Sequence, residues 1–306
     1  MSMPAPLLIF GAAGQVGAEL CRLSTSGRPV VGLERTAADI TDPAVVARAV
    51  ETHRPAVVVN AAAYTAVDRA ESEPAAAMAL NRDGPAHLAR ACAAAGIPLI
   101  HLSTDYVFDG EKDGPYLETD PVGPLGVYGR TKLEGERAVQ AAWSRHIILR
   151  TAWVYSARRS NFVRTMLRLG REREELGVVA DQRGCPTAAA DIASAILAIA
   201  GRLEAGVSDD GFGVFHCCGR GATTWYDFAR TIFELAAPLG GPQPRLRAIT
   251  TADYPTPAQR PRNSVLDTSR LESVYGVTMP AWRDSLAVCL LDLCAEHLCA
   301  QRLSGG

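Results

Sequence analysis

Lysine is nearly absent from this chain of 306 residues. Of its 31 basic residues, 29 are arginine and two are lysine, at Lys112 and Lys132. Arginine keeps its charge in proteins, whereas a lysine side chain can shift its pKa and lose its proton. Any chemistry that needs a titratable ammonium group is therefore confined to these two positions.

Other absences exclude whole classes of protein. No run of 18 apolar residues predicts a spanning helix, and a net charge of −2 gives no overall field for nucleic acid or anionic membrane. The eight cysteines form no CxxC pair and fit no common zinc spacing. The start of the chain has no basic segment typical of a signal peptide. We predict a cytoplasmic protein that binds neither nucleic acid nor membrane.

Short apolar segments alternate with helical patterns through the first half of the chain. Parallel strands buried on both faces read as continuous apolar runs separated by helices. We therefore predict an α/β fold with a doubly wound parallel sheet of the Rossmann type. The expected strands are 7–10, 30–33, 57–59, 99–102 and 147–149, and the expected helices include 42–52, 74–95 and 128–142.

The alternation is lost after residue 150, which indicates a second unit. The expected helices there are 161–170, 188–200, 225–236 and 282–298. We predict a dinucleotide-binding domain over residues 1–150, with 171–200 packing back onto it. A smaller, mainly C-terminal α/β substrate lobe is expected from 151–170 and 201–306.

A glycine-rich turn follows the first expected strand and opens a helix. Its pattern is GxxGxxG, with Gly11, Gly14 and Gly17 as the glycines and Gln15 and Val16 at the helix start. Such a turn lets the backbone approach a pyrophosphate at the positive end of a helix. In this strand–turn–helix context the pattern predicts dinucleotide binding.

The end of the second expected strand bears on the choice between NADH and NADPH. Glu34 can accept hydrogen bonds from a ribose 2′-hydroxyl, whereas Arg35 can pair with a 2′-phosphate. Asp39 and Ile40 follow and can flank the adenine, although a loop Asp before a helix cap explains Asp39 almost as well. Glu34 favours NADH and Arg35 favours NADPH, so the choice of cofactor stays open.

The third expected strand ends in small residues. Ala62 and Ala63 allow a cofactor to approach the backbone, and Tyr64 and Thr65 follow in the same loop. Ligands of open α/β sheets bind at the carboxyl ends of the strands, so we expect these four residues to contact a cofactor.

Tyr128 and Lys132 stand four residues apart at the start of an expected helix, one turn apart on one face. A nearby ammonium group stabilises tyrosinate and lowers the pKa of the tyrosine, and Lys132 is also expected to reach ribose hydroxyls. Chance predicts only about 0.05 such pairs in a chain of this composition. Ser103 and Thr104 follow the fourth strand, where either hydroxyl can polarise a carbonyl beside Tyr128.

The order of these motifs resembles the extended short-chain dehydrogenase/reductase superfamily. Within it, stretches spread over nearly the whole chain resemble the dTDP-4-dehydrorhamnose reductase family. That family reduces the 4-keto group of dTDP-4-dehydro-L-rhamnose with NADPH or NADH, giving dTDP-L-rhamnose. The stretches include NAAAYTAVDRAESEP (60–74), STDYVFDG (103–110), VYGRTKLEGE (127–136), RTAWVY (150–155) and YPTPAQRPRNS (254–264).

The resemblance implies roles at matching positions. Tyr128 would donate the proton, Lys132 would set its pKa and anchor the ribose, and Thr104 would tune the carbonyl. Cofactor contacts are implied for Gly14, Gln15, Val16, Asp39, Ile40 and Ala63 to Thr65, and sugar-nucleotide contacts for Thr104, Asp105 and Trp153.

Two residues of the second half are further substrate candidates. Trp153 offers a flat apolar face to a sugar or base, although core packing would also explain it. Arg260 can pair with the substrate diphosphate, although a surface role is also open in a chain so rich in arginine.

The chain departs from the resemblance at one point. Some family members have an acidic residue shortly after a G-x-P-T turn that contributes to a Mg²⁺ site at a dimer interface. Here three alanines follow the turn, and Asp191 comes only after them. We therefore predict no bound metal, and a homodimer stays open.

Two alternative functions are weighed against a reductase. One is an epimerase or dehydratase of the same superfamily, although the usual second acid of a dehydratase is absent beside Thr104 and Asp105. The other is a non-catalytic, cofactor-binding partner like the regulatory subunit of methionine adenosyltransferase. Stoichiometric oxidation of the cofactor separates a reductase from both.

Overall fold

The computed structural model describes residues 5–25 and 28–304, with side chains up to residue 295. A central sheet of six parallel strands has the order β10-β5-β4-β3-β1-β2. The predicted doubly wound α/β fold is therefore confirmed. Its strands are β1 (Leu7–Phe10), β2 (Val30–Leu33), β3 (Val57–Asn60), β4 (Leu99–Thr104), β5 (His146–Thr151) and β10 (Gly213–His216).

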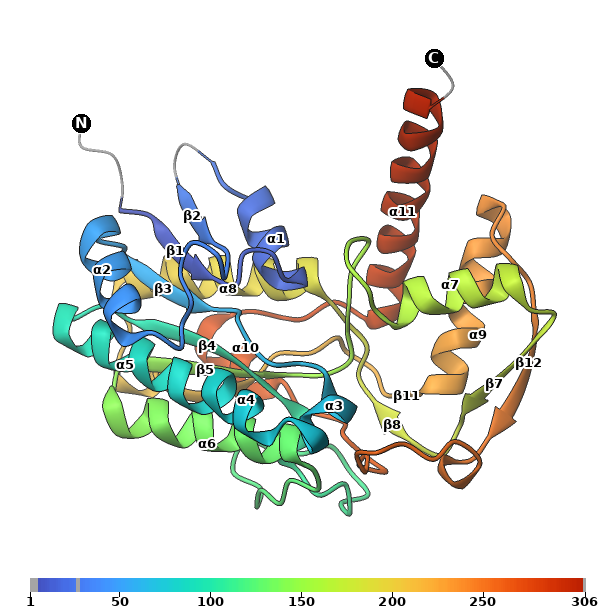
Figure 1. The fold of residues 1–306 in the computed structure, drawn as a ribbon, viewed down its shortest axis with the longest axis horizontal. Helices are drawn as coiled ribbons and strands as arrows, with labels where there is room; N and C mark the ends of the chain where they lie inside the picture. Colours follow the sequence, from blue (N-terminus) through green and yellow to red (C-terminus); the bar gives the residue numbers. More distant parts are fainter. Residues whose placement is uncertain (1–4, 26–27, 305–306) are drawn as a thin grey trace.

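Helices cover both faces of this sheet because its strands are apolar on both sides (Figure 1). Alternate residues face opposite ways, so Leu7 and Ile9 enter one core while Leu8 and Phe10 enter the other. The first core is completed by α1 (Gln15–Arg22), α8 (Ala189–Ala205) and α10 (Ser269–Tyr275), and the second by α2 (Pro43–His53), α5 (Gly84–Ala95) and α6 (Val127–Ala142).

The expected helix over 74–95 contains an interruption. It consists of α4 (Pro74–Met78), a π-helical turn η1 (Ala79–Asp83) and α5, joined without a break. The short helix α3 (Val67–Ser72) precedes it. Single π turns within α-helices often mark functional positions, and this one contains the fully buried Asn81.

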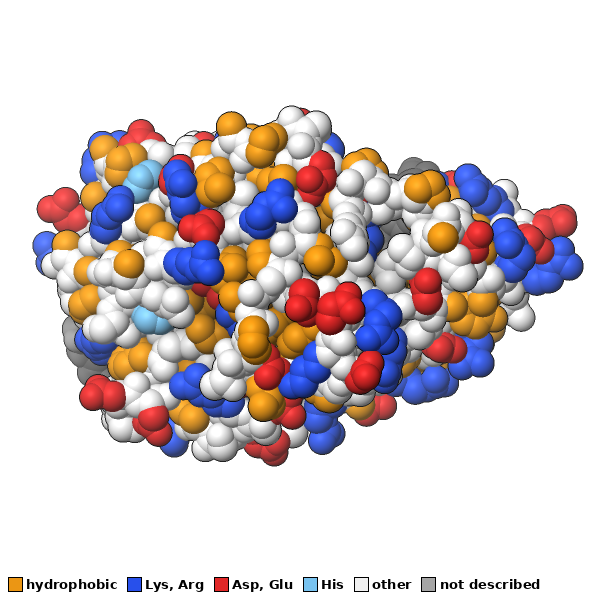
Figure 2. Space-filling view, turned by 90° about the horizontal axis from the view of Figure 1, so that it is seen from below, with side chains coloured by type: hydrophobic (Ala, Val, Ile, Leu, Met, Phe, Trp, Pro, Cys, Tyr) orange, Lys and Arg blue, Asp and Glu red, His pale blue; other side chains and the backbone are white. Residues whose placement is uncertain are grey.

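A second, smaller lobe lies beside the sheet and has its own apolar core (Figure 1). Phe228, Ile232, Leu286 and Leu290 are central to that core. The lobe contains α7 (Phe162–Glu172), α9 (Trp225–Ala236), the start of α11 (Trp282–Ser304) and the parallel pair β7 (Glu175–Val179) and β12 (Arg245–Ile249). Basic and acidic side chains are interspersed on the face that Figure 2 shows.

Two short strand pairs connect the lobe to the sheet. β6 (Val154–Tyr155) pairs with β9 (Thr187–Ala188), and β8 (Arg183–Gly184) pairs antiparallel with β11 (Thr223–Thr224). The remaining elements are 3₁₀ turns, namely η2 (Asp105–Val107), η3 (Asp209–Gly211), η4 (Ala237–Leu239) and η5 (Thr251–Asp253). Strand β10 and helix α10 come from the stretch expected in the substrate lobe, yet both pack in the sheet domain.

Candidate active site

The first turn of α6 carries Tyr128 at the carboxyl end of the sheet. The helix begins after Gly126, whose extended backbone lets the Val127 N–H donate to the Glu71 carboxylate at 2.7 Å. Tyr128 is half-buried, and its ring packs edge-on against Tyr106 with the ring centroids 5.8 Å apart. The phenol is thus held by packing near the end of β4.

Burial raises the pKa of Tyr128 to about 12, and the Asp105 carboxylate adds to that shift. A hydrogen bond with the Thr104 hydroxyl opposes it. The direction is opposite to the lowered pKa expected from the neighbouring lysine. A phenol of this pKa stays protonated at neutral pH, which is the form a proton donor needs.

Lys132 lies one helical turn after Tyr128 and is 1% exposed. Its Nζ donates a hydrogen bond to the backbone oxygen of Leu102 at 2.7 Å, so the side chain is anchored on β4. Burial lowers the pKa of Lys132 to about 8, although Glu136 opposes this shift. This is the titratable ammonium group that the scarcity of lysine singled out, and its partner is a strand carbonyl.

The two candidate hydroxyls at the end of β4 have different partners. Ser103 donates to the Glu136 carboxylate at 2.5 Å and therefore faces helix α6. Thr104 lies next to Tyr128, and its hydroxyl donates to Asp105 at 2.9 Å. Of the two, Thr104 is the hydroxyl that meets the phenol.

Asp105 is almost fully buried beside this hydroxyl. Burial raises the pKa of its carboxyl to about 6, although the Ser264 and Thr104 hydroxyls oppose the shift. The folded protein therefore holds this proton to a higher pH than the unfolded chain, whose Asp has a pKa of about 3.9. The stability that this proton contributes is complete below about pH 4 and is lost as the pH rises through about 6.

Asp105→Asn should remove this dependence. We expect the melting temperature of the variant, measured relative to wild type, to rise between about pH 4 and pH 7. Thermal melts monitored by circular dichroism measure the difference. Asp120 is a matched control, because a hydrogen bond from Lys112 lowers the pKa of its carboxyl: Asp120→Asn should lose stability relative to wild type as the pH rises toward about 4 and should stay level from about pH 4 to pH 7. Parallel pH profiles for Asp105→Asn and wild type would contradict the prediction.

The glycine-rich turn fits a dinucleotide phosphate. Gly11 has a φ of +88°, and a Cβ there would lie 2.6 Å from the Ala62 backbone nitrogen. A Cβ on Gly17 would collide with the Gly11 carbonyl. Helix α1 begins after Gly14 with no side-chain cap, so its first N–H groups keep their capacity to bind an anion. Val16 turns its side chain into the core and can contribute only its backbone here.

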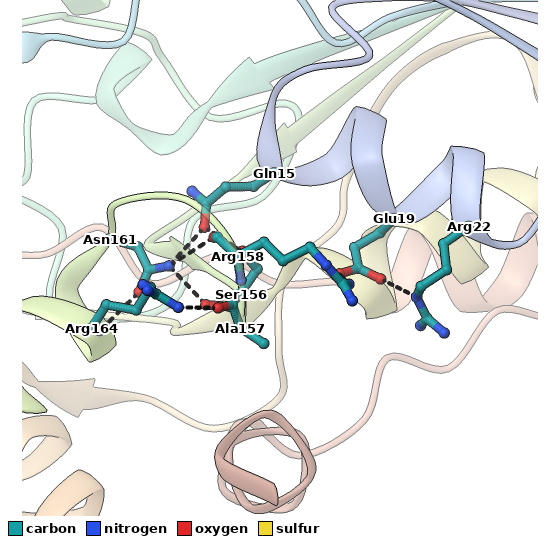
Figure 3. A network of polar contacts seen from close by, with 8 residues as sticks. All are labelled: Gln15, Glu19, Arg22, Ser156, Ala157, Arg158, Asn161 and Arg164. Atoms are coloured by element: carbon teal, nitrogen blue, oxygen red, sulfur yellow. Dashed lines mark hydrogen bonds and ion pairs between the residues drawn. The ribbon is translucent and has the colours of Figure 1, made fainter. Parts of the chain in front are cut away.

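Gln15 connects this turn to the β6–α7 loop (Figure 3). Its side-chain oxygen accepts hydrogen bonds from Ser156 Oγ at 3.0 Å and Asn161 Nδ2 at 3.1 Å. On the next turn of α1, Glu19 pairs with Arg158 at 3.2 Å. The contacts of Ser156 and Asn161 with Gln15 leave no signal in the sequence, because only the tertiary fold brings these residues together.

The residues at the end of β2 lie on the surface. Glu34 and Arg35 are exposed, and Arg35 pairs with Asp39 at 3.1 Å. The Thr41 N–H, more than Arg35, lowers the pKa of Asp39. Ile40 is buried against α5, so it forms a wall rather than a polar contact.

The loop after β3 contains Ala62, Ala63, Tyr64 and Thr65, and it is fastened by Asn81 in the π turn. The Tyr64 N–H donates to Asn81 Oδ1 at 2.8 Å, and Asn81 Nδ2 donates to the Tyr64 carbonyl at 3.1 Å. The same Nδ2 reaches Thr131 Oγ1 at 3.0 Å on the helix that carries Tyr128. Asn81 was missed because a single Asn in an alanine-rich helix carries no signal in the sequence.

Arg260 is engaged within the protein. It forms a two-pronged ion pair with Asp68, with both N–O distances at 2.8 Å, and donates to Thr256 and the Ala258 carbonyl. The pair joins the loop over 254–264 to helix α3. A diphosphate bound by Arg260 would compete with the Asp68 carboxylate.

Among residues 5–25 and 28–295, no group of three His, Cys, Asp or Glu side chains is arranged to bind a metal. Asp191 accepts a hydrogen bond from Ser285 Oγ at 2.5 Å, and burial raises the pKa of its carboxyl.

Comparison with known proteins gives one consistent family. The family model described as RmlD substrate binding domain matches residues 5–294. A relative named dTDP-4-dehydrorhamnose reductase from Sinorhizobium fredii is 47% identical over 279 residues, which cover 91% of this chain and 94% of the relative. The Escherichia coli K12 protein of the same name is 45% identical over 283 residues, covering 90% and 94%.

Solved structures agree with the sequence comparison. The dTDP-4-dehydrorhamnose reductase of Clostridium acetobutylicum superposes with a TM-score of 0.87 at 39% identity, covering 94% of this chain and 99% of that one. The Bacillus anthracis enzyme in complex with NADP gives 0.88 at 32% identity, covering 95% and 100%. A UDP-glucose 4-epimerase of Thermus thermophilus, 20% identical with a TM-score of 0.78, shares the fold.

Proposed function

The chain belongs to the RmlD substrate binding domain family, and we propose that it is a dTDP-4-dehydrorhamnose reductase. It would reduce the 4-keto group of dTDP-4-dehydro-L-rhamnose to give dTDP-L-rhamnose, using NADPH or NADH. The observation that carries the proposal is the half-buried Tyr128, which lies beside Thr104 and one turn before the buried Lys132. Identity of 42–47% to reductases over most of the chain supports it.

In this proposal Tyr128 donates a proton to the ketone oxygen, and a raised pKa keeps that proton available. The Thr104 hydroxyl donates its one proton to Asp105, and it would turn that proton to the ketone oxygen when the substrate binds, so that it polarises the same carbonyl. Lys132, one helical turn away and anchored on the Leu102 carbonyl, would supply the positive charge that favours tyrosinate as it forms. The nicotinamide supplies the hydride when bound, and this chain supplies position and the proton.

The cofactor would lie over the carboxyl edge of the sheet. The glycine-rich turn, with Gly11, Gly14 and the N–H groups of Gln15 and Val16, would hold the pyrophosphate. Ala62, Ala63, Tyr64 and Thr65 would line its path, with Ile40 and Asp39 beside the adenine. The second lobe, with Trp153 and the loop of Arg260, would hold the sugar nucleotide.

Arg35→Ala tests the cofactor preference. Arg35 is exposed at the end of β2, where a 2′-phosphate would meet it. We expect the variant to bind NADPH about tenfold more weakly, because it loses one charge-assisted pair, and to bind NADH within about twofold of wild type. Titration of cofactor fluorescence measures both constants, with Arg48→Ala on α2 as an exposed control. Equal loss for the two cofactors would contradict the prediction.

We propose that the protein works in the cytoplasm on a small nucleotide-linked sugar, without nucleic acid, and that it can form a homodimer. No helix within the described residues is long and apolar enough to span a membrane. Size-exclusion chromatography with light scattering, with and without Mg²⁺, tests the dimer and its dependence on metal.

The decisive experiment supplies dTDP-4-dehydro-L-rhamnose with NADPH or NADH and identifies the product by NMR. A reductase oxidises one cofactor per dTDP-L-rhamnose formed. Conversion without net oxidation of the cofactor would instead support an epimerase or dehydratase. Cofactor binding without turnover would support a regulatory partner protein.

A further inference from the structure

Trp153 is held in an unusual backbone conformation at the edge of the proposed site. It follows the end of β5 by two residues, and Thr151 in that strand pairs with Thr104 of β4. Its φ is +46°, a left-handed value that is rare for a bulky residue and persists only where surrounding structure imposes it. The residues packed around Trp153 must therefore hold its backbone in this conformation.

One face of the Trp153 indole is covered by a second tryptophan. The rings of Trp153 and Trp225 are parallel within 6°, and their centroids are 3.5 Å apart. Phe162 supports Trp225 with its ring centroid at 4.5 Å, and Phe228 follows in the core of the lobe. Such full overlap is uncommon, because offset or edge-on aromatic pairs are preferred. Trp225 is thus placed by its own packing and not by the indole alone.

Gly184 lies against the same indole. A Cβ on this glycine would collide with three indole atoms of Trp153, namely Cε2, Nε1 and Cζ2. With Trp225 stacked at 3.5 Å, its own side of the indole has no room for a backbone, so Gly184 must approach from the other side. Trp153 therefore stands in a slot and presents its rim, rather than the free flat face expected from the sequence.

The two walls of the slot are joined to each other. Gly184 pairs with Thr223 in the β8–β11 ladder, and Trp225 follows that strand as the first residue of α9. Next to the glycine, Arg183 exchanges backbone hydrogen bonds with Arg262 and Ser264, both at 2.8 Å. The Gly184 backbone on one side and the Trp225 ring on the other therefore restrict the Trp153 indole to a single position.

We propose that Gly184 and Trp225 form a slot that fixes Trp153, and that Trp225 is thereby a positioning residue for the sugar-nucleotide substrate. This inference rests on the proposed function. The rim of the fixed indole forms a wall of the substrate site, two residues beyond the strand end that pairs with Thr104. Trp225 acts through Trp153 and touches neither cofactor nor the reacting atoms.

Trp225→Leu and Gly184→Ala test the slot from its two sides. The first removes the stacked wall, and the second adds a Cβ that a rigid strand presses against the indole. We expect each to raise KM for the sugar nucleotide about tenfold, with kcat within about threefold and the dissociation constant of NADPH within about twofold. Trp143→Phe, at the far end of α6, is the matched tryptophan control.

A spectroscopic readout reports the stack directly. An indole held rigidly in an asymmetric environment gives a tryptophan band in near-ultraviolet circular dichroism, at longer wavelengths than thymine absorbs. The part of this band that comes from Trp153 and Trp225 should be lost in Trp225→Leu, weaken in Gly184→Ala, and persist in Trp143→Phe and in wild type saturated with dTDP. Loss of this part of the band when dTDP binds wild type would overturn the proposal, because Trp225 would then be displaced by the ligand.

The kinetic and binding measurements also test the positioning role of Trp225. An unchanged KM in both slot variants, or NADPH affinity that falls in parallel with KM, would overturn the positioning role. The dissociation constant of dTDP, measured by calorimetry, should rise about tenfold in the slot variants whether or not the protein turns over the keto sugar. A wild type that binds dTDP but reduces no keto sugar would therefore refute the proposed function without refuting the slot.

Discussion

Tyr128→Phe is expected to lower kcat by a factor of about 10² to 10⁴ while the dissociation constant of NADPH stays within about twofold. The phenol lies one helical turn before the buried Lys132, in hydrogen-bond contact with Thr104. Phenylalanine keeps the ring that packs edge-on against Tyr106 and removes only the proton donor. Steady-state kinetics of NADPH oxidation with the keto sugar measures the loss.

The expected loss of kcat in Tyr128→Phe is large because the protein must supply a proton to the ketone oxygen. Hydride transfer to a ketone creates negative charge on oxygen, and without a donor that charge must be met by water or by the Thr104 hydroxyl alone. Tyr226→Phe in α9 of the second lobe is a matched control that also removes one phenol and should keep kcat. Near wild-type kcat in Tyr128→Phe would refute the proton-donor role, whatever the cofactor affinity.

The proximity of Tyr128 and Lys132 could be predicted from the sequence because the two residues are only four positions apart. One helical turn separates the two residues in any α-helix, and an apolar strand and a glycine-rich turn are equally local patterns. The first five strands, from 7–10 to 147–149, were predicted for the same reason. Strand β10 (Gly213–His216) was missed because four residues in a stretch without alternation give too short a pattern.

The tertiary contacts of the candidate site residues could not be predicted from the sequence. Lys132 is anchored on Leu102, 30 residues away, and Arg260 is paired with Asp68, 192 residues away. Neither of these contacts leaves a trace in the local sequence pattern, and the expected contacts of the lysine with a ribose and of the arginine with a diphosphate stay predictions. The pKa of Tyr128 was expected to fall, but burial, which only the fold sets, raises it.

The buried network behind Lys132 leads to the second large prediction. Glu136, one turn further along α6, accepts two prongs of the Arg150 guanidinium at 2.7 and 3.0 Å and a hydrogen bond from Ser103. Both members of the ion pair are under 5% exposed. Arg150 Nη1 has no hydrogen-bond partner within the described part of the chain, and its guanidinium lies 5.1 Å from the Phe108 ring centroid.

Glu136→Ala should destabilise the fold by about 3–5 kcal/mol, because it leaves the Arg150 charge buried and unpaired. Because the shift per kcal/mol falls with chain length to roughly 1.6 °C at 306 residues, the melting temperature should fall by about 5–8 °C. Chemical denaturation gives the free energy. Glu172→Gln, which breaks an exposed pair with Arg168 on α7, is the control and should cost at most about 1 kcal/mol.

The double variant Glu136→Gln/Arg150→Met separates the pair's own contribution from the cost of breaking it. Well-packed replacements of both charges in a buried pair are often neutral, whereas removal of one partner is costly. We expect the double variant to recover most of the stability lost in Glu136→Ala. Such a recovery would indicate that the ion pair orients α6 against β4 and β5 and adds little net stability. The double variant also removes the Glu136 carboxylate, which raises the pKa of Lys132. Lys132 should therefore lose its proton, and the protein its activity, at a lower pH than in wild type. A double variant as unstable as Glu136→Ala would instead show that the ion pair itself stabilises the fold.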